Sequence, residues 1–487
     1  MIYNNTIKVN DILFRSGERY MLNVALHNLG CKVNSYELDV IQQDLQKKGY
    51  TIVPFDTLAD IYIINTCTVT NIADRKSRQM LHQAKKRNEE AIVVALGCYV
   101  QTGMEDVLKD SGIDLAIGNN KKKDTIAIIE EFMCKRYNGD EVSKTLNDSS
   151  IININETYEY ERMKLEHSAE HTRAYIKIQD GCNQFCTYCI IPFARGRVRS
   201  RQVEDIISEI AGLVKKGHKE VVLTGIHISS YGIDFEDEAF ANGKCIDKEK
   251  DNNRLDYSGE TKLMELVEAI HKIEGLERIR LGSLEPRIIT EECAKRLARL
   301  EKVCPHFHLS LQSGCDSTLK KMNRRYDTRE FSTSVEALRK VYKNPAITTD
   351  IIVGFPGETE QDFEVTEKYL RDIKLYEMHI FKYSIRKNTQ AAKMKEQVLE
   401  KDKTSRSGRL LALEQELSHQ YREMYIGKEV VVLFEEAKEF DGEKYMIGHT
   451  REYLKVAVKF EENLVNQIKK VKLQEFLGET IVFGELF

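Results

Sequence analysis

Three closely spaced cysteines constrain this chain more than any other feature of its sequence. Cys182, Cys186 and Cys189 lie in the segment YIKIQDGCNQFCTYCIIPFARGRVRSR, directly after an apolar run that predicts a strand. Thiolates are soft ligands, and cysteine-rich loops of this kind are typical of iron–sulfur clusters. The next cysteine along the chain is Cys245, far from the triplet. The pattern therefore predicts a cluster with three protein ligands and one open iron.

A structural zinc site is the alternative for the same cysteines, with a fourth ligand such as His171. Zinc sites typically combine two CxxC-like pairs, or a cysteine pair with a histidine pair. That second pair is missing here, so we favour the iron–sulfur cluster. Its open iron could bind a substrate or a cofactor.

The chain around the triplet predicts a barrel of parallel strands and helices. Six apolar runs alternate with helical patterns, at residues 174–178, 220–224, 278–282, 306–311, 346–352 and 378–383. Six such units imply a complete or partial barrel, whose chemistry belongs at the carboxyl ends of the strands. The triplet follows the first strand. Residues 234–260 are acid-rich and predict a surface insertion.

A second set of three cysteines lies in the N-terminal part. Short apolar runs at 22–28, 61–65 and 91–96 alternate with helical patterns, which predicts a parallel α/β sheet. Each run leads into a loop that carries a cysteine: Cys31, Cys67 and Cys98. Carboxyl ends of parallel strands face one crevice, so these thiols can converge there. Singly, each is more easily explained as a buried small residue. Together they predict a second cluster, whose open iron could hold a sulfur atom.

The remaining patterns divide the chain into five segments. Residues 1–20 form an extension, 21–134 the N-terminal α/β domain, 135–170 a polar linker, 171–418 the barrel, and 419–487 a small antiparallel β barrel. The expected fold is therefore a multidomain α/β protein.

Composition places the chain among cytoplasmic globular proteins. Hydrophobic residues make up 41%, the net charge is −4, and neither a membrane span nor a signal core is present in the sequence. Thiols stay reduced in such a compartment. We therefore interpret the other five cysteines as packing or surface residues: Cys134, Cys245, Cys293, Cys304 and Cys315.

These motifs together resemble the methylthiotransferase family of radical S-adenosylmethionine (SAM) enzymes. The resemblance rests on LGCKVN, NTCTVT, LGCYVQ, GCNQFCTYC and the C-terminal β segment, which is similar to a TRAM domain. Further segments, including VVLTGIHISSYG, LSLQSGCD, TDIIVGFPGET and YSIRKNTQAAKM, are most similar to the subgroup that acts on N6-threonylcarbamoyladenosine in tRNA. The sequence departs from the family in three ways. The family usually starts close to the equivalent of Met21, so residues 1–20 are additional. Asn388 stands where glycine is common, and the insertion at 234–260 is longer than usual.

The resemblance implies two [4Fe-4S] clusters, held by Cys31, Cys67 and Cys98 and by Cys182, Cys186 and Cys189. One SAM molecule would methylate sulfur, and a second would yield the radical that abstracts hydrogen from C2 of the adenosine at tRNA position 37. The cofactor carries this chemistry, and no side chain is assigned as a catalytic acid, base or nucleophile. The implied partners are tRNA, a flavodoxin- or ferredoxin-like electron donor and a sulfur donor, with the enzyme a monomer.

Further site residues follow from position. Arg195, Arg197 and Arg199 come just after the triplet and predict a cationic strip for RNA phosphates, although a solvated charged face or contact with the SAM carboxylate would explain them too. Four residues lie at or near the strand ends where a barrel ligand sits, and are expected to contact SAM: Tyr188, Gly225, Gln312 and Asp350. Turn formation or internal hydrogen bonding is the alternative for these four.

Other functions remain open from the sequence. Within the family, the target could be isopentenyladenosine in tRNA or an aspartate of a ribosomal protein. A different class is a non-catalytic RNA-binding protein whose thiols hold zinc. The C-terminal barrel, with ten Lys or Arg against thirteen Asp or Glu in residues 421–487, weakens a purely electrostatic argument for tRNA binding.

Overall fold

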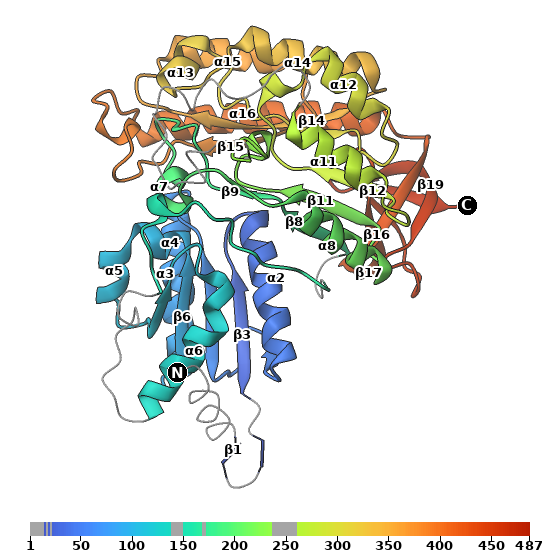
Figure 1. Cartoon of the computed structure of the whole chain (residues 1–487). Helices are drawn as coiled ribbons and strands as arrows, with labels where there is room; N and C mark the ends of the chain where they lie inside the picture. The colour runs from blue at the N-terminus through green and yellow to red at the C-terminus, as the bar shows by residue number, and fades with distance from the viewer. Residues whose placement is uncertain (1–13, 16–17, 20–21, 138–149, 168–171, 236–260) are drawn as a thin grey trace.

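Three folded parts follow one another along the chain (Figure 1). The computed structural model describes residues 14–15, 18–19, 22–137, 150–167, 172–235 and 261–487. A parallel sheet with helices on both faces comes first, then an open barrel of parallel strands, and last a small closed β barrel. The multidomain α/β architecture predicted from the sequence is confirmed.

The N-terminal sheet has the strand order β4-β3-β5-β6-β7, and every neighbouring pair is parallel. The strands are β3 (Asn23–Asn28), β4 (Thr51–Val53), β5 (Ile61–Thr66), β6 (Ile92–Gly97) and β7 (Leu115–Ile117). β3, β5 and β6 confirm the three predicted strands. β4 and β7 were not predicted, because three residues are too few to give a recognisable period.

Helices cover both faces of this sheet, since every residue of β5 and β6 is buried. One face packs against α2 (Lys32–Lys47) and α6 (Thr125–Tyr137). The other packs against α3 (Asn71–Arg87), α4 (Cys98–Thr102) and α5 (Met104–Lys109). The carboxyl ends of β3, β5 and β6 lead into the loops or helices that carry the three N-terminal cysteines.

The central strands form two parallel sheets of three strands, β12-β11-β8 and β13-β14-β15. The strands are β8 (Arg173–Lys177), β11 (Glu220–Thr224), β12 (Arg278–Leu281), β13 (His306–His308), β14 (Ala346–Val353) and β15 (Glu377–Lys382). Two isolated parallel bridges, Ile279–Val303 and Leu284–Leu309, join the sheets between β12 and β13. The predicted partial barrel is confirmed, and it is open between its edge strands β8 and β15.

Helices pack on the outside of this barrel and bury the apolar face of each strand. They are α8 (Val203–Lys215), α11 (Lys262–His271), α12 (Glu291–Ala298), α13 (Asp316–Lys321), α14 (Thr328–Val341) and α15 (Glu360–Ile373). Ile206, Ile210 and Leu213 form a buried stripe along α8. Because side chains alternate along a strand, the other face of each strand lines the barrel interior.

The C-terminal part begins with the long helix α16 (Glu400–Glu423), so the boundary expected at residue 419 falls inside this helix. A closed barrel follows, in the order β16-β17-β18-β20-β19. Its strands are β16 (Glu429–Phe440), β17 (Glu443–Thr450), β18 (Lys455–Lys459), β19 (Ile468–Leu477) and β20 (Ile481–Leu486). The prediction of an entirely antiparallel barrel was wrong, because β18 and β20 pair in parallel to close it.

This small barrel docks against the amino-terminal ends of the central strands. The Arg278 guanidinium donates to the carbonyl oxygens of His449 and Val431, both at 2.9 Å. Arg173 forms an ion pair with Glu435 at 3.1 Å. Arg173 and Arg278 are the first residues of β8 and β12. The C-terminal barrel therefore lies at the end of the central barrel opposite to the cysteine triplet.

Several predictions fall on segments that the structure describes only in part. Of the predicted insertion, residues 236–260 with Cys245 lie outside the described residues, as does His171. In the predicted linker, residues 150–167 contain the short helix η2 (Ile154–Glu156) and pack into the protein, with Leu165 fully buried. Of the extension, the short strands β1 (Phe14–Arg15) and β2 (Glu18–Arg19) pair with each other. No helix among the described residues is long and apolar enough to cross a membrane.

Candidate functional site

The cysteine triplet lies on a loop that is pinned at its base. β9 (Gln179–Asp180) and β10 (Arg199–Ser200) pair antiparallel, and the loop between them carries all three thiols. Gly181 has a φ of +73°, and a β-carbon there would lie 1.8 Å from the Arg197 carbonyl oxygen. Only glycine fits such a close approach. The Cys182 amide donates to the Gly196 carbonyl at 3.0 Å and completes the turn.

The three thiols of this loop lie within electrostatic range of one another. Burial, and then the neighbouring Cys186 thiol, raise the pKa of Cys189 to about 12. The pKa of Cys182 is raised by burial and by the thiols of Cys186 and Cys189. Arg324 donates from Nη1 to the Cys186 sulfur at 3.1 Å. The loop thus gathers three thiols beside a partly buried cation, which suits an anionic thiolate-bound group.

The second set of cysteines converges at the carboxyl edge of the N-terminal sheet. Cys31 precedes α2, Cys67 follows β5, and Cys98 begins α4 after β6. Burial raises the pKa of Cys67 to about 11, and the thiols of Cys98 and Cys31 add to this rise. Gly30, with a φ of +106°, would place a β-carbon 3.0 Å from the Cys67 sulfur. The predicted convergence of these side chains is therefore present in the structure.

The two sets of cysteines face one interface between the N-terminal sheet and the barrel. Asn119 donates from Nδ2 to the Cys98 sulfur at 3.5 Å and to the Ala194 carbonyl oxygen at 2.7 Å. Ala194 belongs to α7 (Ile191–Arg195), which begins two residues after Cys189 and packs against α4. Figure 1 shows α7 directly beside α4. One amide side chain therefore bridges the segments that carry the two sets.

A cavity of about 450 Å³ opens at this interface. Its lining comes from three segments: the helices α3 to α5 of the N-terminal part, the residues after Cys189, and the loop after β15. The lining residues are Asp74, Arg78, Tyr99, Gln101, Thr102, Gly103, Met104, Glu105, Asp106, Ile190, Phe193, Arg386, Lys387 and Asn388. Tyr99 and Ile190 are the immediate neighbours of Cys98 and Cys189 in sequence. The cavity is therefore lined by the residue that follows one cysteine of each set, although no cysteine is among the described residues that line it.

A network of buried ion pairs shows that one prediction from the sequence was wrong. Arg195 and Arg199 were expected to face RNA phosphates, yet both side chains are fully buried. Arg195 donates to Glu37 at 2.9 Å and to Asp180 at 3.1 Å, and Arg199 lies 3.8 Å from Asp180. Groups without solvent contact and with internal carboxylate partners cannot reach an RNA backbone in this structure. Arg195 joins the barrel to α2 instead, and Arg199 donates to the Arg195 carbonyl oxygen at 2.9 Å.

Glu37 is the hub of this network. It accepts from Lys177 of the barrel at 2.7 Å and also pairs with Lys122 and Arg195. Burial alone would raise the pKa of Glu37, but these three cations outweigh it and hold the pKa well below 4.5. Among Glu37, its three partners, Asp180 and Arg199, four cations face two carboxylates. The excess positive charge lies near Cys98, which contributes to the raised pKa of Arg195.

Arg197 differs from its neighbours and remains partly exposed. Its guanidinium carbon lies 4.6 Å from the centre of the Phe185 ring. The predicted role of Arg197 in binding RNA phosphates is compatible with this position and stays a prediction.

The four predicted SAM contacts occupy different levels of the barrel. Tyr188 packs against Phe355, with ring centres 6.4 Å apart. Gly225 is held closely against Gln179, whose side chain accepts from the next two amides. Gln312 adopts a φ of +73° and pairs with β14, whereas Asp350 lies in the middle of β14. The role of these residues in binding SAM stays a prediction.

Three polar residues at the site were not predicted from the sequence, because none of them stands in a pattern that indicates a role. Arg324 and Asn119 contact cysteine sulfurs from distant parts of the sequence. Arg386 bridges the loop after β15 to α3, donating to Thr68, Asn71 and Asp74 at 2.7 Å each. Arg386 lies in the family-like motif YSIRKNTQAAKM, which indicated the importance of this segment but not of the arginine itself. Asn388, where the family usually has glycine, has a φ of +72°, a conformation that asparagine tolerates better than most residues.

Comparisons with known proteins agree with this architecture. Family models match residues 176–370, as the radical SAM superfamily, and residues 23–118, as the uncharacterized protein family UPF0004. The structure of the radical S-adenosylmethionine methyltransferase TsrM from Kitasatospora setae superposes with a TM-score of 0.52 at 15% identity, over 74% of this chain and 75% of that one. This likeness supports the fold alone.

Curated relatives are similar over nearly the whole chain. The chain is 38% identical to threonylcarbamoyladenosine tRNA methylthiotransferase MtaB of Bacillus subtilis, over 93% of this chain and 94% of the relative. It is also 38% identical to MtaB of Aquifex aeolicus, over 87% and 96%. It is 34% identical to the tRNA-2-methylthio-N(6)-dimethylallyladenosine synthase of Clostridium botulinum strain Langeland, over 91% and 92%. The chain therefore belongs to the radical SAM family of tRNA methylthiotransferases.

Proposed function

We propose that this enzyme converts N6-threonylcarbamoyladenosine at tRNA position 37 to its 2-methylthio derivative. Family membership implies tRNA as substrate, and SAM with one [4Fe-4S] cluster as cofactors. The modified base, the second cluster and the roles of individual residues are parts of the proposal. The observation that carries it is the bridge that Asn119 makes between Cys98 and the backbone of Ala194, because this bridge joins the segments that carry the two cysteine sets.

In this proposal the two sets of thiols divide the work. Cys182, Cys186 and Cys189 would hold the cluster that binds SAM. This cluster would supply one electron that cleaves SAM into methionine and a 5′-deoxyadenosyl radical, which is able to abstract hydrogen from C2 of adenine. Cys31, Cys67 and Cys98 hold a second cluster with an open iron for sulfur. The protein positions both groups at one interface, so an adenine between them would face both. An electron donor and a sulfur donor complete the reaction as partners.

The cavity has the chemistry that a single tRNA nucleotide requires. Enzymes that act on a base take it out of the stack and hold it between aromatic side chains. Tyr99 and Phe193 supply such rings, and Phe193 is 43% exposed. Arg78 and Lys387 offer positive charge for the neighbouring phosphates, whereas Arg386 is paired with Asp74, and Glu105 and Asp106 also line the cavity. We infer that the target base enters here.

The relatives guide the choice of modified base. Two relatives named for threonylcarbamoyladenosine are 38% identical to this chain and a third is 33% identical, whereas the one named for dimethylallyladenosine is 34% identical. The two relatives at 38% and the motifs in residues 175–394 favour the threonylcarbamoyl substrate. Dimethylallyladenosine in tRNA is the alternative that the test must separate.

The direct test uses anaerobically reconstituted enzyme with SAM, a reductant, sulfide and two tRNA substrates. One tRNA carries threonylcarbamoyladenosine and the other isopentenyladenosine at position 37. We expect nucleoside mass spectrometry to find the 2-methylthio product only from the first tRNA. Product from the second tRNA alone would reject the assigned base while leaving the enzyme class intact.

Metal analysis of the same preparation tests the second cluster. Two four-iron clusters predict about eight irons per chain and a brown protein. A value of about four irons would reject the second cluster. Colourless protein with one zinc would instead support a non-catalytic RNA-binding protein.

A variant tests the proposed base pocket. Phe193→Ala removes an aromatic ring of the cavity and should raise the KM for tRNA, because stacking on one ring contributes about 1–3 kcal/mol per base. SAM cleavage and iron content should be unchanged. Phe381→Ala is the matched control, since Phe381 is 46% exposed and does not line this cavity. An equal effect of both substitutions on KM would contradict this placement of the base.

A further inference from the structure

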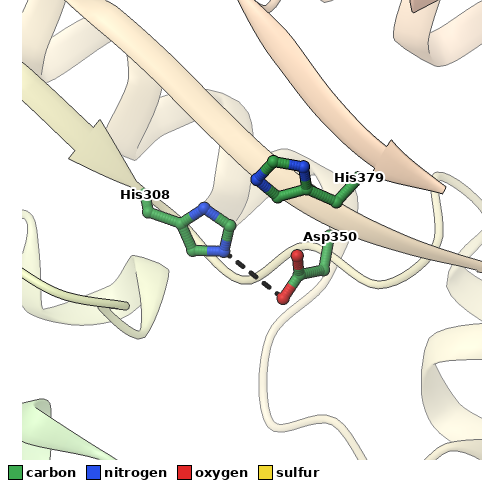
Figure 2. A group of neighbouring side chains, drawn as sticks. All are labelled: His308, Asp350 and His379. Carbon is green, nitrogen blue, oxygen red and sulfur yellow. Dashed lines mark ion pairs between the residues drawn. The ribbon is translucent and has the colours of Figure 1, made fainter. Parts of the chain in front are cut away.

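A group of metal-ligand side chains that contains no cysteine lies inside the barrel. His308, Asp350 and His379 each offer one ligand atom, and these atoms all lie within 4.8 Å of one another. Figure 2 shows the three side chains facing one another, with the contact between His308 and Asp350 dashed. Within the described part of the chain, this is the one group of three such residues that meets this spacing.

Strand register puts the three side chains on one face. Asp350 of β14 lies directly opposite His379 of β15, and His308 of β13 lies opposite Thr348. Thr348 and Asp350 are two residues apart and therefore point to the same side of the sheet. That side is the barrel interior, because Ile347 and Ile351, which point the other way, belong to the core under the helices. Three paired strands hold the ligands in fixed positions.

The hydrogen bonding of His308 prepares it for a metal. Its Nδ1 lies 3.0 Å from the hydroxyl of Thr348, which is 2% exposed. Its Nε2 is buried and has no hydrogen-bond partner among the described residues. A metal-binding histidine typically uses one ring nitrogen for a hydrogen bond and the other for the ion. An unpartnered buried nitrogen is costly without a ligand.

A simple ion pair accounts less well for this geometry. His308 Nε2 and Asp350 Oδ2 are 3.4 Å apart, yet the pair does not have hydrogen-bond geometry. The His379 ring is nearly parallel to that of His308, at 20° and with centres 5.8 Å apart. A pair would not need this third group. A metal ion would be contacted by all three.

We propose that His308, Asp350 and His379 bind a divalent transition-metal ion, with zinc or iron(II) as the class that this donor set prefers. Two imidazoles and one carboxylate are a recurrent set for both ions. Three protein ligands leave at least one position open toward the barrel interior for water or another oxygen ligand. Asp350, predicted from the sequence to contact SAM, would then act as a metal ligand.

The test uses the full-length protein with its iron–sulfur content reconstituted and then treated with a chelator. One equivalent of zinc is added, unbound metal is removed, and zinc and iron are measured together. We expect about one zinc per chain in the native protein. His308→Ala and His379→Ala should lower zinc affinity at least tenfold with the iron content unchanged. His82→Ala is the matched control, because His82 contacts Asp110 at 2.8 Å on the surface without a third ligand.

X-ray absorption at the zinc edge separates this site from the cysteines. Ligands at about 2.0–2.1 Å from nitrogen and oxygen support the proposal, and sulfur ligands at about 2.3 Å overturn it. Equal zinc binding by His308→Ala and His82→Ala overturns it as well.

Thr348→Val supplies a milder variant that keeps all three ligands. Loss of the hydroxyl should weaken zinc binding about 10–100-fold, as for other partners of metal-bound histidines. Unchanged affinity in this variant would contradict the proposed orientation of His308. None of these measurements involves tRNA, so the proposed methylthiolation and the metal site can fail independently.

Discussion

At the residue scale, the surroundings of each thiol decide what it can do. Cys182 and Cys189 are partly exposed and lie beside Cys186, and the buried Cys67 lies beside Cys98 and Cys31. Cys293 and Cys304 are also buried, at 2% and 1% exposure, but neither belongs to one of the two sets of cysteines. The prediction that isolated cysteines serve packing is confirmed for the four that the structure describes, Cys134, Cys293, Cys304 and Cys315.

Substitution of single cysteines should separate the two halves of the reaction. Cys182→Ala should abolish SAM cleavage, because the SAM-binding cluster loses one of three ligands. Cys67→Ala should retain SAM cleavage but stop sulfur insertion. The measurements are release of 5′-deoxyadenosine and nucleoside mass spectrometry of tRNA.

The control for both is Cys293→Ala, which changes a buried thiol far from either set and should retain both activities. Loss of SAM cleavage in a folded Cys67→Ala protein would contradict the division of labour between the two clusters.

Arg324 should tune the cluster beside it. Its guanidinium is partly buried and donates to the Cys186 sulfur at 3.1 Å. Hydrogen bonds and positive charge near the sulfurs raise a cluster's reduction potential. Arg324→Gln should therefore lower the potential of this cluster and slow SAM cleavage, with iron content unchanged. A redox titration followed by electron paramagnetic resonance measures the shift. An unchanged potential would show that Arg324 serves packing alone.

At the scale of elements, the β9–β10 ribbon determines the path of the cysteine loop. A pair of two-residue strands fixes both ends, and Gly181 lets the backbone of residue 181 pass the Arg197 carbonyl. The sequence predicted a loop after a strand, but it contained no periodic pattern for strands this short. The ribbon forms because distant residues pair across the cysteine loop.

Two glycine substitutions should have opposite effects. Gly181→Ala would place a β-carbon 1.8 Å from a backbone oxygen, so the loop must move and the triplet should lose its iron. Gly212→Ala lies in α8, where the added β-carbon meets no atom within 4 Å. Alanine favours a helix interior over glycine by about 1 kcal/mol, so the second variant should be slightly more stable. Iron content and thermal melting check both outcomes. Full iron content in Gly181→Ala would disprove the steric argument.

At the scale of the whole molecule, buried charges join the N-terminal sheet to the barrel. Glu37 of α2 meets Lys177 of β8 and Arg195 of α7, all without solvent contact. Arg386 makes a second connection, from the loop after β15 to α3. These contacts hold the segments that carry the two cysteine sets at a fixed separation. Ion pairs as well as apolar packing therefore determine how the N-terminal sheet and the barrel are placed relative to each other.

Removal of the central carboxylate should destabilise this interface. Glu37→Gln leaves Lys122, Lys177 and Arg195 without their shared anion, and breaking a buried pair costs about 3–5 kcal/mol. Glu443→Gln is the control, because Glu443 pairs with Lys459 on the exposed surface of the small barrel. Thermal melting should show a clear loss of stability for the first variant and little change for the second. Equal melting temperatures would contradict the role of Glu37.

The pH dependence follows from the same group. The pKa of Glu37 in the folded protein lies well below the ordinary 4.5, so the folded state binds the proton more weakly than the unfolded state. Its stabilisation is therefore complete above about pH 5 and decreases as the pH falls below 4.5 toward the folded pKa. The difference in melting temperature between native protein and Glu37→Gln should shrink over that range. A difference that grew on acidification would contradict this sign.

Much of the molecule could be predicted from the sequence because its signals are local. Apolar runs identified the long strands, and the spacing of Cys182, Cys186 and Cys189 indicated the SAM-binding cluster. Family resemblance then indicated the reaction. The short strands β4, β7, β9 and β10 were missed, and the parallel β18–β20 pair was not expected, because pairing partners far apart in sequence decide both.

The sequence could not predict which charged side chains are buried and which face solvent. Arg195 and Arg199 follow the triplet on a basic stretch that is typical of RNA binding, yet their carboxylate partners Glu37 and Asp180 bury them. Likewise, His308, Asp350 and His379 are far apart along the chain and meet only through the register of three strands. The sequence alone determined which thiols are available and on which strand ends they lie, since ligand type and strand pattern are local. Only the tertiary structure decided which charges face solvent and which side chains converge, because burial and long-range pairing are properties of the folded chain.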